Sequence, residues 1–567
     1  MPSLIKIAAA GAALALTAFA HARPSNVESR QVDNSNSTDL PIVDLGYVVQ
    51  RATVFNDTGN YYNFSNIRYA QPPVGDLRFR APFPPLQNRS VVETGEIDRI
   101  CPQSNPAWLL TAMQFIPAYL AGKKDFTAAD FNTSSGSSSL PAQDPRTTED
   151  CLFLDVQVPK HIFDQADKKD VEGAPVLVWI YGGGFASGSK QAAGNPAGLL
   201  ARAQNEKNKG VVYVAMNYRL GAFGWLSGPT LQEDGTANAG LHDQRFALEW
   251  IQENIHKFGG DPKRVTIVGE SAGGASVMHQ ITAFGGSKPV PFQQVVAQSP
   301  GFQPIPSNIV QDDIFNAFLG LAGAKTITEA RELPYEKLQI ANIISTGASR
   351  YGQYTWGPVV DGIFAPQLPG QLLAKGQYAK GVNVMVGHNQ DEGLLFVNPL
   401  VSNSTAFEES IDTTQPSIKA FPENKDYLVN TLYPADAYQS TIERSAAFVA
   451  DSAFVCNTFF LDKAFKNQTY AYFFVVPPAL HGTDVAYTFY NDGGASSSVI
   501  NVDVAIALQE YITHFAEMGS PSETGVPYFP IYGENATVTV LNVTSITQAV
   551  DPAANEKCNW WQKALYY

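Results

Sequence analysis

Short apolar runs alternate with helical patterns through the middle of the chain. The runs at 175–180, 211–217, 265–269, 294–299, 382–387 and 470–476 predict buried strands. The clearest helical pattern is 243–259, where Phe246, Trp250 and Ile251 recur near helical spacing. Near-continuous apolar strands separated by helices are typical of a mostly parallel sheet that is covered on both faces. We therefore predict a doubly wound α/β fold, in which segment 305–380, with its short helices and aromatic residues, is an insertion over one end of the sheet.

The N-terminus has a pattern of its own. One lysine precedes an apolar run from Ile7 to Ala20, and small residues follow up to Ala22. This layout predicts a secretory signal peptide over residues 1–22, cleaved near Ala20 or Ala22. The run is shorter than the roughly 20 apolar residues that a membrane span needs, and no later segment approaches that length. We expect the mature chain, residues 23–567, to be secreted and to have no integral membrane segment.

Composition narrows the class of protein further. The 567 residues are 44% hydrophobic and 16% charged, which is enough apolar material for a large core. A net charge of −15 gives no basic footprint for nucleic acid, so no nucleic-acid partner is predicted. Nine Asn-x-Ser/Thr sequons are glycosylation candidates on a secretory route: Asn36, Asn56, Asn63, Asn88, Asn132, Asn403, Asn467, Asn535 and Asn542.

The four cysteines are Cys101, Cys151, Cys456 and Cys558. An even number of cysteines in an oxidising compartment predicts two disulfides, and the sequence alone leaves three pairings open. Their spacing fits no metal site, and nothing else in the chain implies a metal or a cofactor.

A serine motif follows the predicted strand 265–269. Residues 269–273, Gly-Glu-Ser-Ala-Gly, match G-x-S-x-G, and a helical run comes directly after them. A strand that turns abruptly into a helix holds its central residue on a strained corner, so Ser271 would project its hydroxyl above the sheet. Side chains at Gly269 and Gly273 would collide there. In this strand–turn–helix context the motif predicts a nucleophilic serine of the α/β-hydrolase type.

A serine nucleophile needs a base, and the base needs an orienting carboxylate, in the chain order serine, acid, histidine. His481, in the loop after strand 470–476, is the histidine whose position fits; the others precede Ser271, lie on predicted helices or come too early. Three carboxylates remain open as the acid: Asp361, Asp391 and Glu392. The loop after strand 382–387 favours one of the last two.

The glycine run of "YGGGF" (181–185) stands at the end of strand 175–180. An acyl-transfer site must stabilise a tetrahedral oxyanion, and backbone N–H groups aimed at that oxygen do so without reorganisation. The backbone approaches closely only where no Cβ intervenes. We therefore expect the glycine loop, together with the N–H of Ala272, to form an oxyanion hole.

From about residue 45 to the C-terminus the chain closely resembles the type-B carboxylesterases, a family that includes fungal lipases and cholinesterases. The resemblance rests on segments 66–79, 149–156, 179–185, 217–226, 240–274 and 389–393 and on the region of His481. It implies a catalytic triad of Ser271, Glu392 and His481. It also implies oxyanion donors at Gly183, Gly184 and Ala272, a supporting serine at Ser299 beside the acid, and disulfides Cys101–Cys151 and Cys456–Cys558.

Two departures from the family pattern stand out. Asp484 occupies a position that often holds glutamate. Trp108 lies close to the first cysteine of the loop 101–151, whereas cholinesterases place their choline-binding tryptophan nearer the second, so cholinesterase activity is not expected.

The resemblance implies one α/β-hydrolase domain over residues 23–567 and a secreted serine carboxylic ester hydrolase that works through an acyl-enzyme. Its substrate would be a small-molecule or lipid ester, and the oligomeric state is not indicated. The apolar stretch 107–122 within the loop 101–151 could be a hinged lid or a fixed wall, so a triacylglycerol lipase of the same family is the alternative. A non-enzymatic alternative is an adhesion or binding protein of cholinesterase-like fold.

Overall fold

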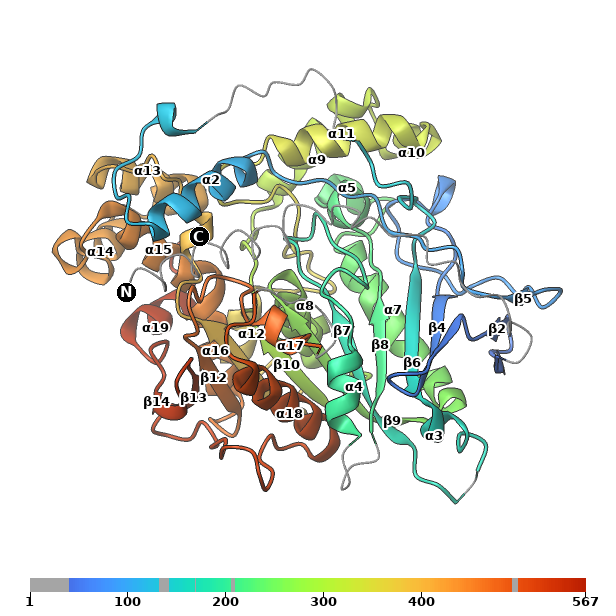
Figure 1. Cartoon of the computed structure of the whole chain (residues 1–567). Coiled ribbons are helices and arrows are strands. Elements are labelled where there is room, and N and C mark those ends of the chain that lie inside the picture. Colours follow the sequence, from blue (N-terminus) through green and yellow to red (C-terminus); the bar gives the residue numbers. More distant parts are fainter. Residues whose placement is uncertain (1–39, 132–141, 169, 205–209, 492–497) are drawn as a thin grey trace.

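The computed structural model describes residues 40–131, 142–168, 170–204, 210–491 and 498–567 (Figure 1). The predicted signal peptide and the sequons Asn36 and Asn132 lie outside these residues. An eleven-stranded sheet with the order β14-β13-β12-β11-β10-β9-β7-β8-β6-β4-β3 runs through the described part. Its strands are β3 (Val54–Asn56), β4 (Tyr61–Arg68), β6 (Phe153–Pro159), β7 (Ala174–Ile180), β8 (Val212–Met216), β9 (Gly260–Glu270), β10 (Gln294–Gln298), β11 (Asn383–Asn389), β12 (Tyr470–Phe474), β13 (Thr537–Leu541) and β14 (Ile546–Val550).

The middle of this sheet is parallel, from β8 through β7, β9, β10, β11 and β12 to β13. Antiparallel pairs occur toward its edges, between β8 and β6, β6 and β4, β4 and β3, and β13 and β14. A smaller sheet joins β1 (Ile42–Asp44), β2 (Val49–Arg51) and β5 (Val92–Glu93). All residues of β7, β8 and β10 are buried, as expected for parallel strands covered on both faces.

Helices cover both faces of the sheet. Figure 1 shows α4 and α18 in front of the central strands, and α7 and α8 behind them. These helices and two others that pack beside the sheet are α4 (Ala197–Ala203), α7 (Ala239–Asn254), α8 (Ala272–Thr282), α12 (Pro369–Ala374), α16 (Cys456–Ala464) and α18 (Val502–Met518). The predicted α/β fold is confirmed. Helix α7 begins four residues earlier than the pattern 243–259 indicated, because Asn238 in the left-handed conformation turns the chain into the helix at Ala239.

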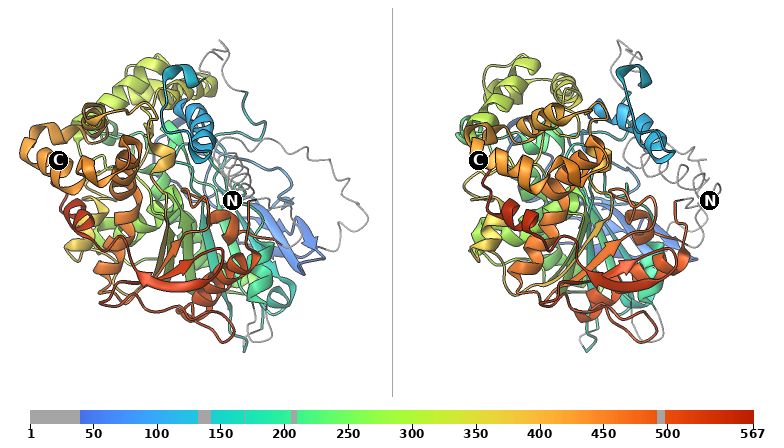
Figure 2. Two further views of the ribbon diagram at one scale, coloured as in Figure 1. Left: turned by 60° about the vertical axis from the view of Figure 1, so that its left-hand side comes forward. Right: turned by 90° about the vertical axis from the view of Figure 1, so that its left-hand side faces the viewer.

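A further group of helices lies together beyond one end of the central strands, across the top of Figure 1. It consists of α2 (Trp108–Leu120), α9 (Asn308–Ala322), α10 (Ile327–Glu332) and α11 (Tyr335–Gly347). Helices α13 (Ser404–Thr414), α14 (Pro422–Tyr427) and α15 (Thr441–Ala450) lie to the side of them, as the two turned views of Figure 2 also show. The first part of the predicted insertion 305–380 therefore corresponds to α9–α11, whereas α12, in its last part, packs beside the sheet against α8 and α16.

Two disulfides, Cys101–Cys151 and Cys456–Cys558, join segments far apart in the chain, with the pairing that the family resemblance implies. The second bridge links α16 to the short helix α19 (Glu556–Gln562) near the C-terminus. Among the described helices, none combines the length and the apolar character that crossing a bilayer requires.

Candidate active site

Ser271 stands on the corner between β9 and α8. Its backbone adopts φ 58° and ψ −123°, a strained conformation that a residue other than glycine seldom adopts. A Cβ on Gly269 would lie 2.5 Å from the carbonyl of Gly273, and a Cβ on Gly273 would lie 2.0 Å from the carbonyl oxygen of Ile180. The two glycines of the motif are therefore required by the closeness of neighbouring backbone, as the sequence pattern indicated.

His481 lies between Ser271 and Glu392. Its Nε2 is 2.7 Å from Oγ of Ser271, and its Nδ1 is 2.5 Å from Oε2 of Glu392. An ionised Glu392 can only accept, so Nδ1–H donates to it and Nε2 accepts from the serine hydroxyl. Both His481 and Glu392 are fully buried, and Ser271 is 6% exposed. This is the arrangement in which a serine hydroxyl can pass its proton to an imidazole.

The structure places the three candidate acids in different surroundings. Asp391, next to Glu392 on the same turn, is exposed and contacts the side chain of Gln390. Asp361 lies elsewhere and accepts a hydrogen bond from the Asn238 amide at 2.8 Å. Of the three, Glu392 is the one whose carboxylate meets His481.

Glu392 is held by a set of hydrogen bonds behind it. Its Oε1 accepts from Oγ of Ser299 and from the backbone N–H of Asn389, both at 2.6 Å. The Asn389 amide in turn donates to Asp484 at 3.1 Å, and the hydroxyl of Tyr472 donates to the other oxygen of Asp484 at 2.5 Å. Ser299 lies where the resemblance placed it. The Asn389–Asp484–Tyr472 extension was not predicted; its signals in the sequence were segment 389–393 and Asp484, at a position that often holds glutamate in the family.

The pKa values of the histidine and the acid shift in opposite directions. Burial alone would lower the pKa of His481, but the neighbouring carboxylates of Glu392 and Glu270 outweigh it and raise that pKa above its ordinary value. Burial alone would raise the pKa of Glu392, but His481 and the hydrogen bonds from Ser299 and Asn389 lower it. The environment therefore favours an ionised acid beside an imidazole able to accept a proton.

Glu270, the variable position of the serine motif, is a residue that sequence reasoning left without a role. Its Oε1 lies 3.5 Å from Nε2 of His481, too far for a good hydrogen bond, and has no hydrogen-bond partner. Burial, together with the nearby Asp484 and Glu392, raises the pKa of Glu270 to about 8, although His481 partly counters the shift. This carboxyl therefore keeps its proton to a higher pH than an exposed glutamate does. The sequence feature that could have identified Glu270 is its position inside the serine motif, directly before Ser271.

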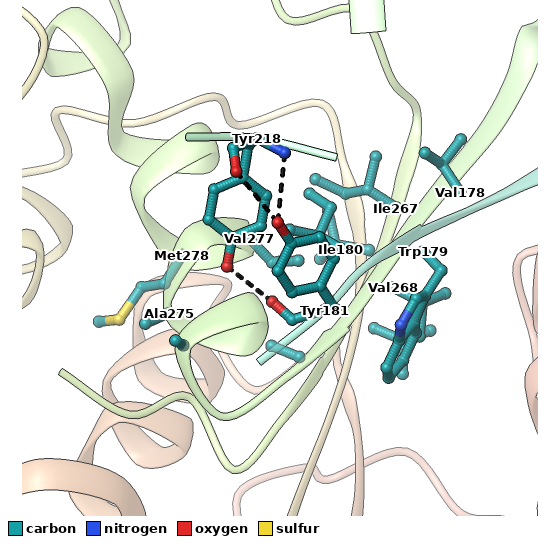
Figure 3. Packing of buried hydrophobic residues seen from close by; sticks show 14 of the residues in the cluster. Val178, Trp179, Ile180, Tyr181, Tyr218, Ile267, Val268, Ala275, Val277 and Met278 are labelled. Atoms are coloured by element: carbon teal, nitrogen blue, oxygen red, sulfur yellow. Dashed lines mark hydrogen bonds between the residues drawn. The ribbon is translucent and has the colours of Figure 1, made fainter. Parts of the chain in front are cut away.

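The glycine loop is anchored by two tyrosines. Tyr181 and Tyr218 stack with ring centroids 4.4 Å apart, and each hydroxyl donates to the backbone carbonyl of the other residue, at 3.0 and 2.8 Å (Figure 3). Beyond Tyr181 the chain passes through Gly183 and Gly184 with φ of 113° and 60°, which a side chain would strain. Among the described residues, none accepts a hydrogen bond from the N–H of Gly183 or Gly184.

The strand that carries the loop is firmly packed. Figure 3 shows Val178 and Ile180 of β7 beside Ile267 of β9, with Val277 and Met278 of α8 close by. All five side chains are fully buried. Because β7 and β9 are parallel neighbours, the glycine loop after β7 and the serine corner after β9 emerge at the same end of the sheet.

A cavity of about 80 Å³, as the space open to the centres of water molecules, adjoins Ser271 and Gly184. Aromatic side chains supply much of its wall: Phe185, Phe302, Tyr351, Tyr354, Trp356, Phe396 and Phe454. A site of this size holds roughly five to eight water molecules, since each needs roughly 10–15 Å³. The site therefore suits a compact group beside the serine.

Helix α2 packs behind one side of the cavity wall. Trp108 at its start packs against Tyr351, Tyr354 and Phe396 of the cavity wall, and its Nε1–H donates to the carbonyl of Gln353 at 2.8 Å. Further along the helix, Phe115 and its neighbours are buried in the same apolar cluster. In this structure the helix is a packed part of the wall.

The remaining histidines that the sequence set aside lie elsewhere. His388 contacts Asp551 at 3.3 Å, and Nδ1 of His279 lies 2.8 Å from the carbonyl of Ala275 in its own helix.

Three sequon asparagines are exposed, namely Asn88, Asn403 and Asn535, while Asn56, Asn63, Asn467 and Asn542 are half-buried.

With this geometry in place, comparison with known proteins is informative. The model of the carboxylesterase family matches residues 43–561. The chain belongs to the carboxylesterase family. It is 39% identical to carboxylesterase patB of Penicillium expansum over 551 residues, a match that covers 94% of this chain and 97% of that protein. It is also 32% identical to Lipase 2 of Geotrichum candidum, over 68% of this chain and 66% of the lipase.

Solved structures agree on the fold. The crystal structure of Aspergillus niger EstA aligns with a TM-score of 0.75 at 23% identity, covering 92% of this chain and 98% of that one. As a carboxylesterase, the protein is an enzyme that hydrolyses carboxylic esters, and its α/β-hydrolase fold is the one predicted.

Proposed function

We propose that this carboxylesterase is a secreted serine esterase that cleaves compact esters through an acyl-enzyme on Ser271. The observation that carries the proposal is the buried chain of contacts from Ser271 Oγ through His481 to Glu392, with distances of 2.7 and 2.5 Å, beside a cavity. These distances lie within the reach that proton transfer between a nucleophile and its base requires.

In the proposed reaction, Oγ of Ser271 bonds to the ester carbonyl carbon while His481 Nε2 takes the hydroxyl proton. The carbonyl π electrons move onto oxygen, and the N–H groups of Gly183, Gly184 and Ala272 stabilise the resulting oxyanion. When the tetrahedral intermediate collapses, the bond to the alcohol breaks, and His481 gives the departing alkoxide its proton.

Water then repeats the sequence on the acyl-enzyme. The water oxygen attacks the acyl carbon while His481 takes a proton from that water. His481 then returns the proton to Ser271 Oγ as the bond from Oγ to the acyl carbon breaks and the acid leaves. Glu392 stays ionised throughout, fixing the imidazole tautomer and stabilising the transient imidazolium. The lowered pKa of Glu392 supports this role.

The size of the cavity favours compact esters over long-chain triacylglycerols. Helix α2, the segment that a lipase would move as a lid, packs against the cavity wall through Trp108, and Phe115 is buried in the same apolar cluster. The likeness to fungal lipases keeps lipase activity as the second candidate. We therefore assign helix α2, within the loop 101–151, to a fixed wall rather than a moving lid.

The same proposal includes the chain's route and organisation. Residues 1–22 would be a cleaved signal peptide and residues 23–567 one hydrolase domain, with glycans at exposed sequons such as Asn88 and Asn403. Two disulfides support an oxidising compartment, and a secreted lipase of Arthroderma benhamiae is a relative at 31% identity.

The test is hydrolysis of p-nitrophenyl esters from acetate to palmitate by the secreted wild type and by Ser271→Ala. We expect a short-acyl optimum and a loss of about 10⁶-fold in kcat for the variant. A long-acyl optimum that rises at an emulsion interface would favour the lipase instead. Equal activity of the two proteins would refute Ser271 as the nucleophile.

A further inference from the structure

Tyr354 forms the part of the cavity wall that lies against the glycine loop. A Cβ placed on Gly184 would fall 2.3 Å from both Cε1 and Cζ of the Tyr354 ring, so the hydroxyl-bearing edge of the ring rests directly on Gly184. Gly184 and Tyr354 line the same cavity as Ser271. An ester held at Ser271, with its oxygen at the glycine loop, therefore has the phenol end of Tyr354 as a neighbour.

The ring is held in this position from several sides. The backbone N–H of Tyr354 donates to Oε1 of Gln303 at 3.1 Å, and the ring makes an edge contact with Trp108 at 5.8 Å between centroids. Trp108 is itself fixed by its hydrogen bond to the backbone carbonyl of Gln353. A polar group that is held in place before binding costs little entropy when it bonds to a ligand.

Tyr354 lines the cavity, and among the described residues its hydroxyl makes no hydrogen bond. The hydroxyl of Tyr351, in the same wall, is also unpartnered but is closed off from solvent. The phenylalanines that share the wall, among them Phe185, Phe302 and Phe454, carry no polar side-chain atom. Polar side chains line the cavity too, among them Gln303 and Gln415, but no hydrogen bond joins a described residue to the Tyr354 hydroxyl, which leaves it for a molecule that enters the cavity.

The hydroxyl stays protonated across the working range of pH. Burial raises the pKa of Tyr354 well above its ordinary value, and the nearby Glu270 adds to the shift. A neutral phenol both donates and accepts one hydrogen bond, so it can bond to an ether, carbonyl or hydroxyl oxygen. A methylene group in the same place would displace water from the hydroxyl without replacing the bond that the water made.

We propose that the Tyr354 hydroxyl binds an oxygen atom that the substrate carries within a few bonds of its ester group. The preferred substrates are then esters of small oxygen-bearing acids or alcohols, rather than hydrocarbon esters of the same length. This inference rests on the proposed function, because it needs the ester to be held at Ser271.

The experiment compares pairs of esters in which one methylene is exchanged for oxygen. In the acyl arm the pair is p-nitrophenyl methoxyacetate and p-nitrophenyl butanoate; in the alcohol arm it is methoxyethyl acetate and butyl acetate. The quantity measured is the ratio of kcat/KM, oxygenated over hydrocarbon ester, in the wild type and in Tyr354→Phe. Dividing the wild-type ratio by the Tyr354→Phe ratio cancels the intrinsic reactivity of each ester, because both proteins hydrolyse the same pair.

We expect the ratio to fall about 3- to 10-fold in Tyr354→Phe in one arm, which also shows whether the acid or the alcohol carries the oxygen. Tyr335→Phe is the matched control, because it removes an unpartnered buried hydroxyl on α11 that does not line the cavity. Its ratios should equal those of the wild type.

Unchanged ratios in both arms would overturn the inference. An equal fall in kcat/KM for all four esters in Tyr354→Phe would also overturn the inference, because the hydroxyl would then act on the ester group that the four esters share. Hydrolysis that does not depend on Ser271 would remove the proposed function and this inference together, and Ser271→Ala, assayed first, identifies that case. Near-ultraviolet circular dichroism checks that Tyr354→Phe keeps the native packing.

Discussion

Replacing Glu270 with glutamine tests the electrostatics of the site, because it removes one buried titratable group and keeps the size of the side chain. Burial raises the pKa of Glu270 from 4.5 to about 8. Between these two values the native protein retains a proton that the unfolded chain has lost. The stability of the native state therefore falls as pH rises through this interval, and levels off above the native pKa.

The size of the effect follows from the same two values. Each pH unit within the interval changes the folding equilibrium about tenfold against the native state, and the whole interval amounts to on the order of 5 kcal/mol. Glutamine does not titrate, so Glu270→Gln lacks this contribution. We expect the variant to gain stability relative to wild type steadily from pH 5 to 8, in the direction opposite to that of a salt-bridged carboxylate.

The assay is the urea midpoint, followed by tryptophan fluorescence at pH 5, 6, 7 and 8. Other carboxyls titrate in this range too, so the informative quantity is the difference between the two proteins at each pH. Glu409→Gln, on the exposed surface of α13, is the control and should run parallel to the wild type. Parallel curves for Glu270→Gln as well would show that native Glu270 is ionised, and would refute the reasoning.

Three further changes test other parts of the site. Glu392→Gln should lower kcat about 10⁴-fold with little change in KM, because the imidazole loses its ionised partner; a loss below tenfold would contradict that role. Gly184→Ala puts a Cβ 2.3 Å from the Tyr354 ring at a φ of 60°, so we expect at least a 10²-fold loss in kcat with an intact circular dichroism spectrum, and wild-type kcat would argue against an oxyanion donor there. Removing the disulfide with Cys456→Ser and Cys558→Ser releases two residues 102 apart in sequence, which should cost about 4–5 kcal/mol and lower Tm in calorimetry without changing kcat at 25 °C; an unchanged Tm would contradict it.

The proposed catalytic serine and histidine could be located from the sequence because their environment is local. A buried strand, a corner and a helix follow one another within residues 260–282, and the glycines beside Ser271 report how little space the corner leaves. His481 likewise follows a strand directly. Each feature depends on residues near it in the chain, which is where periodicity and turn chemistry carry information.

The acid could not be selected in the same way. Asp391 and Glu392 are neighbours on one turn after β11, and only the fold decides that Glu392 turns inward to His481 while Asp391 stays exposed. The decision depends on Ser299, which comes from the end of β10, about 90 positions earlier. The family resemblance implied both Glu392 and Ser299, whereas the spacing of residues along the sequence left Asp391 and Glu392 equally open.

The substrate-binding wall is still further from what a sequence pattern can show. Tyr354 touches Gly184 although 170 positions separate them, and the contact depends on how the segment after α11 returns to the glycine loop. The proposed catalytic groups sit on loops directly after parallel strands, so the sheet brings them together at one end. The wall instead comes from insertions that pack on Trp108 and on one another. The chemistry of the reaction can therefore be argued from motifs, whereas the chemistry of the substrate has to be argued from a single hydroxyl and its surroundings.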